Sequence, residues 1–270
     1  MKPSADRIAR GLYWDRAWSL VEGCTPVSAA CDNCWAAQAA HMRKGHPDIH
    51  ISMNNSGITT GGGQFSGVVR TRDDLIDQPL EVKKPAVWAV WTELFHQTVS
   101  PAFQQAAFEV IKSTPQHLYI ILTKRQGRLL RFAEILNDKP LPNLWLGVTA
   151  EDQEAANTRI PFLLQAPAAK RFISAEPMLG PVDLAEFLPQ TVPPDKNDGT
   201  GYLTQGLDWV VCGGESGSGA RPIHPDWARS LRDQCKAAGA PFWFKGWGRH
   251  VPAGQTKGLL DGVGCREWPE

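Results

Sequence analysis

Residues 117–125, HLYIILTKR, decide the fold class because a continuous apolar run ends abruptly in polar residues. An uninterrupted run such as His117–Leu122 is typical of a strand in a sheet that is covered on both faces. Helical patterns lie on either side of it, over 101–112 and 128–136. The stretch therefore predicts one strand in an alternating series of strands and helices.

The same alternation continues outward in both directions. Strands are predicted over seven apolar runs: 17–21, 86–91, 117–122, 143–148, 170–174, 207–212 and 241–245. Helices are predicted between them over 33–44, 101–112, 128–136, 154–164, 183–188 and 226–238. Because connections of this length join parallel strands, the sequence predicts an α/β fold. The sheet is either open and doubly wound or a partial (βα)6-7 barrel of the TIM type, with parallel strands.

We expect a single domain over residues 1–270 with three departures from the regular alternation. They are an irregular excursion or hairpin over 45–85, a polar loop over 189–206 and a C-terminal tail over 249–270. Lys and Arg together number 28, as do Asp and Glu, so the net charge gives no global signal for nucleic acid. The sequence shows no signal peptide and no apolar run of about 18 residues. We therefore expect a cytoplasmic protein that is not in the membrane.

The loop after the first predicted strand, residues 23–36, reads GCTPVSAACDNCWA and places Cys24, Cys31 and Cys34 in a C-x6-C-x2-C pattern. A structural zinc takes four protein ligands, so three thiolates leave it one short. A cubane iron–sulfur cluster held by three thiolates keeps one iron open, and S-adenosylmethionine (SAM) bound there can be cleaved to start radical chemistry. The pattern favours a three-cysteine [4Fe-4S] cluster. The alternative is a zinc site completed by His41.

Polar residues follow six of the predicted strands directly at their C-terminal ends. Thr92 follows the second strand, and the charged residues at the ends are Glu93, Lys124, Glu151, Glu176, Glu215 and Lys245. In a barrel of parallel strands these ends meet on one face, which is where such folds place their sites. The cysteine loop also follows a strand, so we expect it on the same face.

These motifs together resemble a phage- and prophage-encoded family of unknown function, over roughly residues 13–250. The resemblance rests on the cysteine box and on WTELFH (91–96), LTKR (122–125), LWLGVTAED (144–152), SAEPMLGP (174–181), GGESG (213–217) and FKGWG (244–248). That family looks like a divergent branch of the radical-SAM superfamily, in the style of the spore photoproduct lyases. The resemblance implies a partial barrel that carries [4Fe-4S] and SAM, in the host cytoplasm if the chain is phage-encoded.

Two features depart from the commonest radical-SAM pattern. The usual loop is C-x3-C-x2-C, so the loop here is longer by three residues. The Gly-Gly-Glu motif, which in the superfamily ends the second strand and binds the SAM amino group, stands here at the sixth strand. The resemblance therefore assigns the amino contact to Glu93, and further SAM contacts to Trp35, Thr92, Lys124 and Glu151.

The reaction implied is one-electron cleavage of SAM to methionine and a 5′-deoxyadenosyl radical, which takes hydrogen from a substrate near Glu176, Glu215 and Lys245. It requires an external electron donor of the flavodoxin or ferredoxin type. The resemblance suggests a nucleobase or nucleotide substrate, in phage DNA modification or repair, while a peptide or free small molecule stays open. Two other classes remain: a non-redox barrel enzyme, or a non-catalytic protein that binds nucleic acid or a partner, each with structural zinc on the cysteines.

Overall fold

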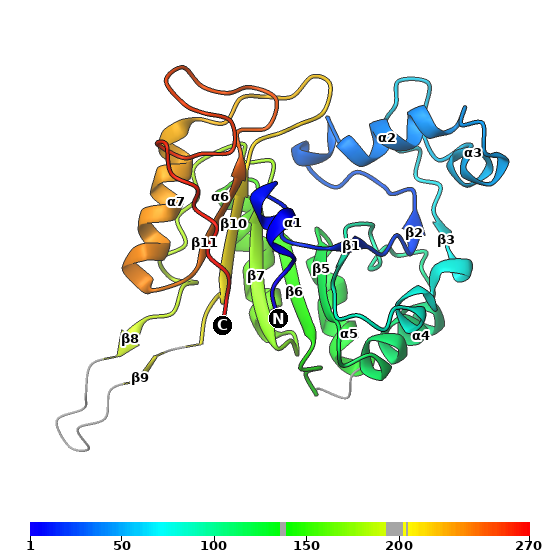
Figure 1. Cartoon of the computed structure of the whole chain (residues 1–270), viewed down its shortest axis with the longest axis horizontal. Coiled ribbons are helices and arrows are strands. Elements are labelled where there is room, and N and C mark those ends of the chain that lie inside the picture. Colours follow the sequence, from blue (N-terminus) through cyan, green and yellow to red (C-terminus); the bar gives the residue numbers. More distant parts are fainter. Residues whose placement is uncertain (136–138, 193–201, 204) are drawn as a thin grey trace.

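A curled sheet of seven parallel strands forms the centre of the protein (Figure 1). The computed structural model describes residues 1–135, 139–192, 202–203 and 205–270. In sheet order the strands are β1 (Arg16–Ala17), β4 (Val87–Val90), β5 (Leu118–Thr123), β6 (Leu144–Thr149), β7 (Lys170–Ala175), β10 (Trp209–Gly213) and β11 (Phe242–Gly246). Each neighbouring pair is parallel, and the sheet closes as a half-barrel. The predicted α/β fold with a partial TIM-like barrel is confirmed.

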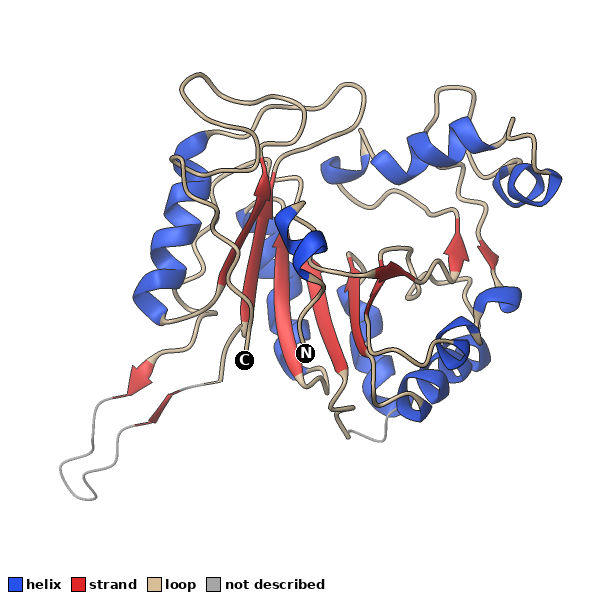
Figure 2. Cartoon of the chain, viewed as in Figure 1, coloured by secondary structure: helices blue, strands red, loops and turns tan. Residues whose placement is uncertain are grey.

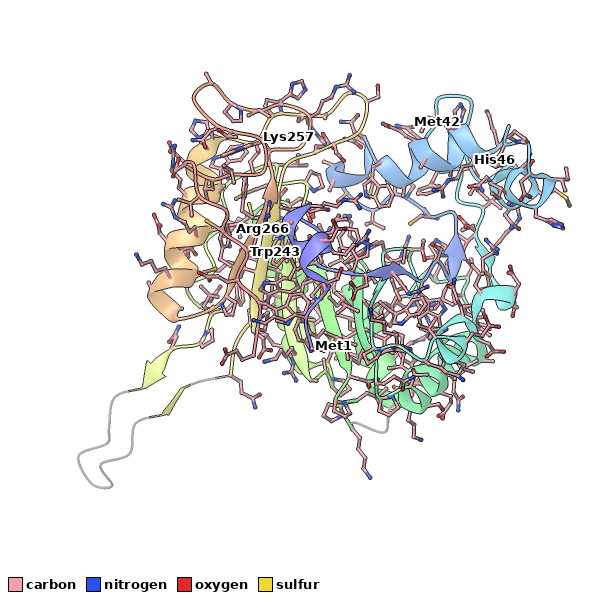
Figure 3. All side chains as sticks on the ribbon, in the orientation of Figure 1. Met1, Met42, His46, Trp243, Lys257 and Arg266 are labelled. Atoms are coloured by element: carbon pink, nitrogen blue, oxygen red, sulfur yellow. The ribbon has the colours of Figure 1, made fainter. Side chains whose placement is uncertain are left out.

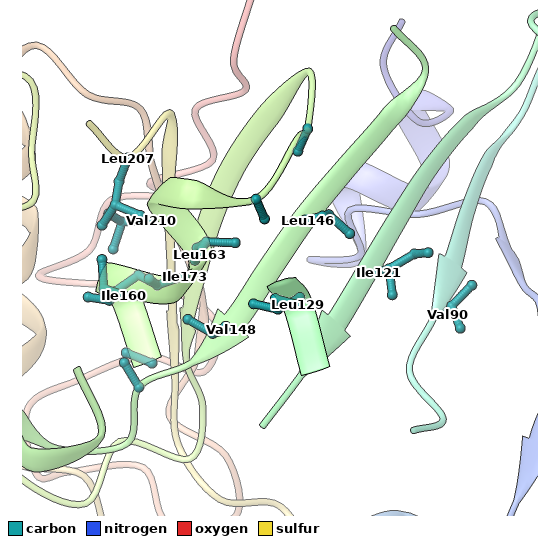
Figure 4. Packing of buried hydrophobic residues seen from close by; sticks show 14 of the residues in the cluster. Val90, Ile121, Leu129, Leu146, Val148, Ile160, Leu163, Ile173, Leu207 and Val210 are labelled. Atoms are coloured by element: carbon teal, nitrogen blue, oxygen red, sulfur yellow. The ribbon is translucent and has the colours of Figure 1, made fainter. Parts of the chain in front are cut away.

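Four helices cover the convex face of the sheet (Figure 2). They are α4 (Pro101–Ser113), α5 (Leu129–Ile135), α6 (Gln153–Gln165) and α7 (Pro225–Ala238). Helix α4 begins with a local signal: the Ser100 hydroxyl accepts from the Phe103 amide at 3.2 Å, and Pro101 occupies the first turn. Aliphatic side chains of strands and helices interlock between the two layers (Figure 4). This layer is the main hydrophobic core.

The concave face is filled by aromatic side chains instead. Every second strand residue points inward, and the buried cluster on this face includes Trp145, Phe172, Trp209 and Trp243, with Tyr13 from the N-terminal segment. Figure 3 labels Trp243 of this cluster. The Tyr13 and Trp209 rings meet edge to face, with centroids 5.1 Å apart. Helix α1 (Ala5–Ala9) lies in front of this face (Figure 1). The packed interior leaves the polar C-terminal ends of the strands as the open part of the half-barrel.

Two predicted elements differ in the structure. The strand expected over 17–21 is divided into β1 and a separate β2 (Val21–Glu22), with Trp18 and Leu20 buried between them. The helix expected over 183–188 is a single turn, in which the Leu188 amide donates to the Leu184 carbonyl at 3.0 Å, and Pro189 directly after it does not continue a helix. The predicted polar loop begins and ends in a ribbon of β8 (Thr191–Val192) and β9 (Tyr202–Leu203); residues 193–201 and 204 lie outside the described part.

The cysteine segment and the first part of the 45–85 excursion stand beyond the C-terminal ends of the strands. The end of the excursion returns to the start of β5, where Nε2 of His117 lies 3.1 Å from the Pro79 carbonyl oxygen. Helix α2 (Trp35–Arg43) follows the cysteines, and α3 (Ile49–Asn55) begins where the Asp48 side chain caps the His50 amide at 2.9 Å (Figure 1). The remaining elements of the excursion are β3 (Arg70–Thr71) and the 3₁₀ helices η2 (Asp73–Leu75) and η3 (Gln78–Glu81). A bridge from Thr59 to Phe65 closes a turn, whereas β3 pairs with β2.

The chain ends against the sheet. Over the predicted tail, 249–270, the Glu267 amide donates to the Phe242 carbonyl at 3.0 Å, and Trp268 is buried among the aromatic side chains of the concave face. In the part of the chain that the structure describes, no helix is long and apolar enough to cross a membrane.

Candidate functional site

The three cysteines lie together at the C-terminal edge of the sheet. None is in a disulfide, each is partly exposed, and all three line one cavity of about 360 Å³. The cavity reaches the ends of β4 and β5, and its other predicted lining residues are Trp35, Thr92, Glu93 and Lys124. The structure thus brings seven of the predicted site residues to one place, which we call the thiol cavity.

A second cavity of about 370 Å³ adjoins the first, and the two share eight lining residues: Trp14, Cys34, Trp35, Ala36, Trp91, Leu122, Lys124 and Thr149. The three residues predicted to hold substrate line this second cavity: Glu176, Glu215 and Lys245. Glu151 lines neither, and instead lies in an open cleft of about 820 Å³ that also reaches Lys124. The Lys124 ammonium makes no hydrogen bond or ion pair with the described residues, so this cation stands free where the three spaces meet.

The cysteine loop is fastened to the ends of β4 and β5 near its first thiol. The Thr25 hydroxyl lies 3.0 Å from Nε2 of buried His96, and Arg125 donates to the Thr25 carbonyl at 2.8 Å. Gly23 enters the loop at φ +85°, and a side chain there would collide with the Val68 carbonyl. The position of Cys24 is therefore set by neighbours distant in sequence.

Glu215 fastens the other end of the loop. Arg221 donates to both carboxylate oxygens, with Nη2 at 2.8 Å from Oε1, and Asn33 beside Cys34 donates at 3.1 Å. The same guanidinium donates to the Ala29 carbonyl at 2.7 Å. Burial alone would raise the pKa of Glu215, but the hydrogen bonds and charge of Arg221 outweigh it and lower the pKa. Glu215 lines the second cavity, yet its oxygens are committed to holding the loop.

Glu151 is committed in the same way. Its side chain is 2% exposed, and Arg159 of α6 donates to both oxygens, with Nη2 at 3.1 Å from Oε1. Burial would raise its pKa, but Arg159 outweighs this and lowers it. The predicted contact of Glu151 with SAM would have to compete with this buried ion pair.

The side chain of Glu93 is 11% exposed in the wall of the thiol cavity, and its charge is less well compensated than that of Glu151 or Glu215. Thr123 donates to Oε1 at 2.6 Å, the Lys124 amide donates to Oε2 at 3.4 Å, and the nearest guanidinium nitrogen of Arg125 is 3.9 Å away. Burial raises the pKa of Glu93, and these contacts reverse the shift only in part. Thr92 lies next to it and accepts from the Val21 amide at 3.3 Å.

Cysteine thiolates are the ligands that iron–sulfur clusters take, but the surroundings of Cys24 disfavour the thiolate form. Burial, and then the charge of Glu93, raise the pKa of Cys24 to about 11, so this thiol needs a metal to be held as thiolate. In a cubane each thiolate binds a different iron, so the sulfur atoms stand apart. Within the described residues, no group of three His, Cys, Asp or Glu side chains is arranged to hold a metal ion. His41 lines a cleft with Cys31 and Cys34, but its Nδ1 lies 3.2 Å from the Thr59 hydroxyl.

The second cavity contains a further charged pair, formed by Lys245 and Glu176. The Lys245 ammonium is 2.9 Å from Oε1 of Glu176, and Ser174 donates to Oε2 at 3.1 Å. The ammonium also stands 6.0 Å from the centre of the Tyr13 ring and 5.7 Å from that of Trp14. Unlike Glu215, whose partner Arg221 is outside the cavity lining, Glu176 is paired with a residue that itself lines the second cavity.

Several lining residues escaped the sequence analysis. Tyr13 and Trp14 precede the first strand, and nothing local marks them. Thr149 and Ser174 carried a signal that was passed over: they continue the inward alternation of Trp145 and Phe172 to the strand ends.

Fold and site define a half-barrel α/β protein with three unbridged thiols at the C-terminal edge of its strands. The chain belongs to a family described as "Protein of unknown function (DUF5131)", which it matches over residues 10–267. A search of curated proteins and a search of solved structures found no match.

Proposed function

We propose that the protein is a radical SAM enzyme that binds a [4Fe-4S] cluster in the thiol cavity. The observation that carries the proposal is the convergence of Cys24, Cys31 and Cys34 on one cavity at the strand ends. The described lining of that cavity contains neither a fourth thiol nor an imidazole. Three protein ligands leave one iron of a cubane available to SAM.

Residues of the same cavity supply groups that suit SAM. Glu93 and Thr92 offer oxygens for its amino group, the free Lys124 ammonium offers a partner for its carboxylate, and Trp35 offers a flat surface for its adenine. When bound, the cluster and SAM together provide one-electron cleavage of SAM and removal of a hydrogen atom from a substrate. An external reductant must supply the electron.

The second cavity then serves the substrate. It adjoins the thiol cavity, so a substrate in it would lie next to SAM, which is the proximity that hydrogen transfer requires. In this proposal Glu176 and Lys245 contact and orient the substrate, and the aromatic walls exclude water from it. Glu215 acts indirectly, by fixing the cysteine loop through Arg221 and Asn33.

Anaerobic reconstitution with iron and sulfide, followed by SAM and dithionite, tests the proposal. We expect 5′-deoxyadenosine to form with the wild-type protein and to be lost in Cys31→Ala. Cys265→Ala is the matched control, because Cys265 lies outside both cavities and should keep the activity. Stoichiometric zinc in the purified protein, with no iron uptake on reconstitution, would overturn the proposal in favour of a zinc site.

A further inference from the structure

The floor of the second cavity contains polar groups that the fold leaves unsatisfied. Thr149, the last residue of β6, is 1% exposed, yet its hydroxyl has no hydrogen-bond partner among the described residues. The indole N–H of Trp91, which follows β4, is also buried without a partner there. Because leaving a buried polar group without a partner is costly, two such groups in the wall that this cavity shares with the thiol cavity indicate a ligand.

The order of the strands places the polar groups of this floor in a row. Thr149 is directly opposite Ser174 in the β6–β7 register, and Ser174 donates to Glu176. Across β10, Lys245 meets the other oxygen of Glu176. Gly213 of β10 lies between them, and a Cβ at this position would come within 2.7 Å of the Glu176 carboxylate. From β6 to β11 the row therefore offers a hydroxyl donor, a carboxylate acceptor and an ammonium donor.

The walls of the cavity are aromatic. Trp14 and Trp91 line it together with Tyr13, and the Trp14 and Trp91 rings meet edge to face with centroids 5.0 Å apart. Flat rings of this kind stack on planar heterocycles such as nucleobases. The aromatic walls thus favour a planar ligand, and the row of polar groups selects which edge of that ligand forms hydrogen bonds.

We propose that the second cavity binds a planar cyclic imide, the edge that a uracil or thymine ring presents. Its carbonyl, N–H and carbonyl face the Thr149 hydroxyl, the Glu176 carboxylate and the Lys245 ammonium in turn. A cytosine ring places an acceptor where the imide has its N–H, and so sets a lone pair against Glu176. As the substrate site, this assignment rests on the proposed function; as a binding site, it stands on the cavity alone.

Titration calorimetry of the reconstituted protein, with and without SAM, tests the inference. We expect uridine to bind, and 3-methyluridine and cytidine to bind about tenfold more weakly or worse. Both lack the ring N–H that donates to Glu176, the first because of its methyl group and the second because its ring nitrogen carries no proton. Riboflavin carries the same imide edge on a larger ring, so its titration distinguishes a flavin from a pyrimidine source. Equal affinity for uridine and 3-methyluridine, or no binding of uridine and riboflavin, overturns the inference.

Thr149→Val provides the sharpest variant, since it removes the hydroxyl and keeps the shape. If the hydroxyl serves a ligand, uridine affinity falls about fivefold to tenfold while the unfolding midpoint stays the same or rises. Thr256→Val, on an exposed loop, should change neither. Unchanged uridine affinity in Thr149→Val contradicts the assignment. SAM cleavage without uridine or riboflavin binding would leave the proposed function standing and overturn the imide site. Imide binding without SAM cleavage would support the imide site and overturn the proposed function.

Discussion

Four glutamates stand at the ends of parallel strands, and they divide into two pairs that do different work. Glu151 and Glu215 each meet an arginine that engages both carboxylate oxygens, and their pKa values are lowered. Glu93 lines the thiol cavity and is held mainly by a hydroxyl, and Glu176 lines the second cavity and is held by Lys245; among the described residues, neither has an arginine on both oxygens. Position at a strand end is shared by all four, so it cannot by itself identify a catalytic group.

The difference shows which of these charged side chains hold the structure together and which are placed to contact a ligand. Through Arg221, Glu215 fixes the cysteine loop, and through Arg159, Glu151 ties the end of β6 to α6. Glu93 and Glu176 instead pair with groups that line the cavities themselves. Variants that separate the two pairs should therefore affect either stability or chemistry, and seldom both.

Arg159→Met should have the largest effect on stability. It leaves the buried Glu151 carboxylate without its partner, and breaking such a pair costs about 3–5 kcal/mol. Urea unfolding of the metal-free protein measures the loss. The double variant Glu151→Gln with Arg159→Met should recover part of it, and a loss below about 1 kcal/mol would show that Glu151 is not held as described.

Acid should reduce the difference in unfolding free energy between the wild-type protein and Arg159→Met. Because the pKa of Glu151 is lowered in the folded protein, its stabilisation is complete above the ordinary value of 4.5 and is lost as the pH falls through the lowered pKa. Once protonated, the carboxyl no longer needs Arg159. Unfolding free energies measured from pH 7 down to about pH 3 should converge, and a constant gap would contradict the assigned cause.

Arg221→Met should cost less, about 1–2 kcal/mol, because this arginine is 36% exposed whereas Arg159 is 8% exposed. Its particular effect falls on the cysteine loop, where hydrogen exchange over 29–34 should become faster. Arg229→Met serves as the control, since its ion pair with Asp261 lies outside both cavities. Equal exchange in the two variants would mean that Glu215 does not tether the loop.

Glu93→Gln should change stability least. Burial raises the pKa of Glu93, so its ionised form costs stability at neutral pH, and a neutral isostere should leave the metal-free protein as stable or slightly more stable. SAM cleavage, in contrast, should fall at least about tenfold if Glu93 contacts the SAM amino group. A destabilisation as large as that of Arg159→Met would show that Glu93 has a structural role like that of Glu151 and Glu215.

The fold was largely predictable because apolar runs and helix starts are local properties. The helix expected over 183–188 is only a single turn, because the apolar pattern is short and Pro189 follows it. Within the site, the three thiols and the strand-end residues could be picked out from spacing. The partners that decide their roles could not, since Arg159 and Arg221 carry no local sign that they bind Glu151 and Glu215.

Electron paramagnetic resonance of the reconstituted, dithionite-reduced protein tests the central claim most directly. If Cys24, Cys31 and Cys34 hold a [4Fe-4S] cluster with one open iron, the reduced protein gives a cluster signal that SAM shifts. Cys31→Ala should lose this signal, and Cys265→Ala should keep it. A signal that SAM leaves unchanged, or a protein that takes up zinc and no iron, would contradict the account.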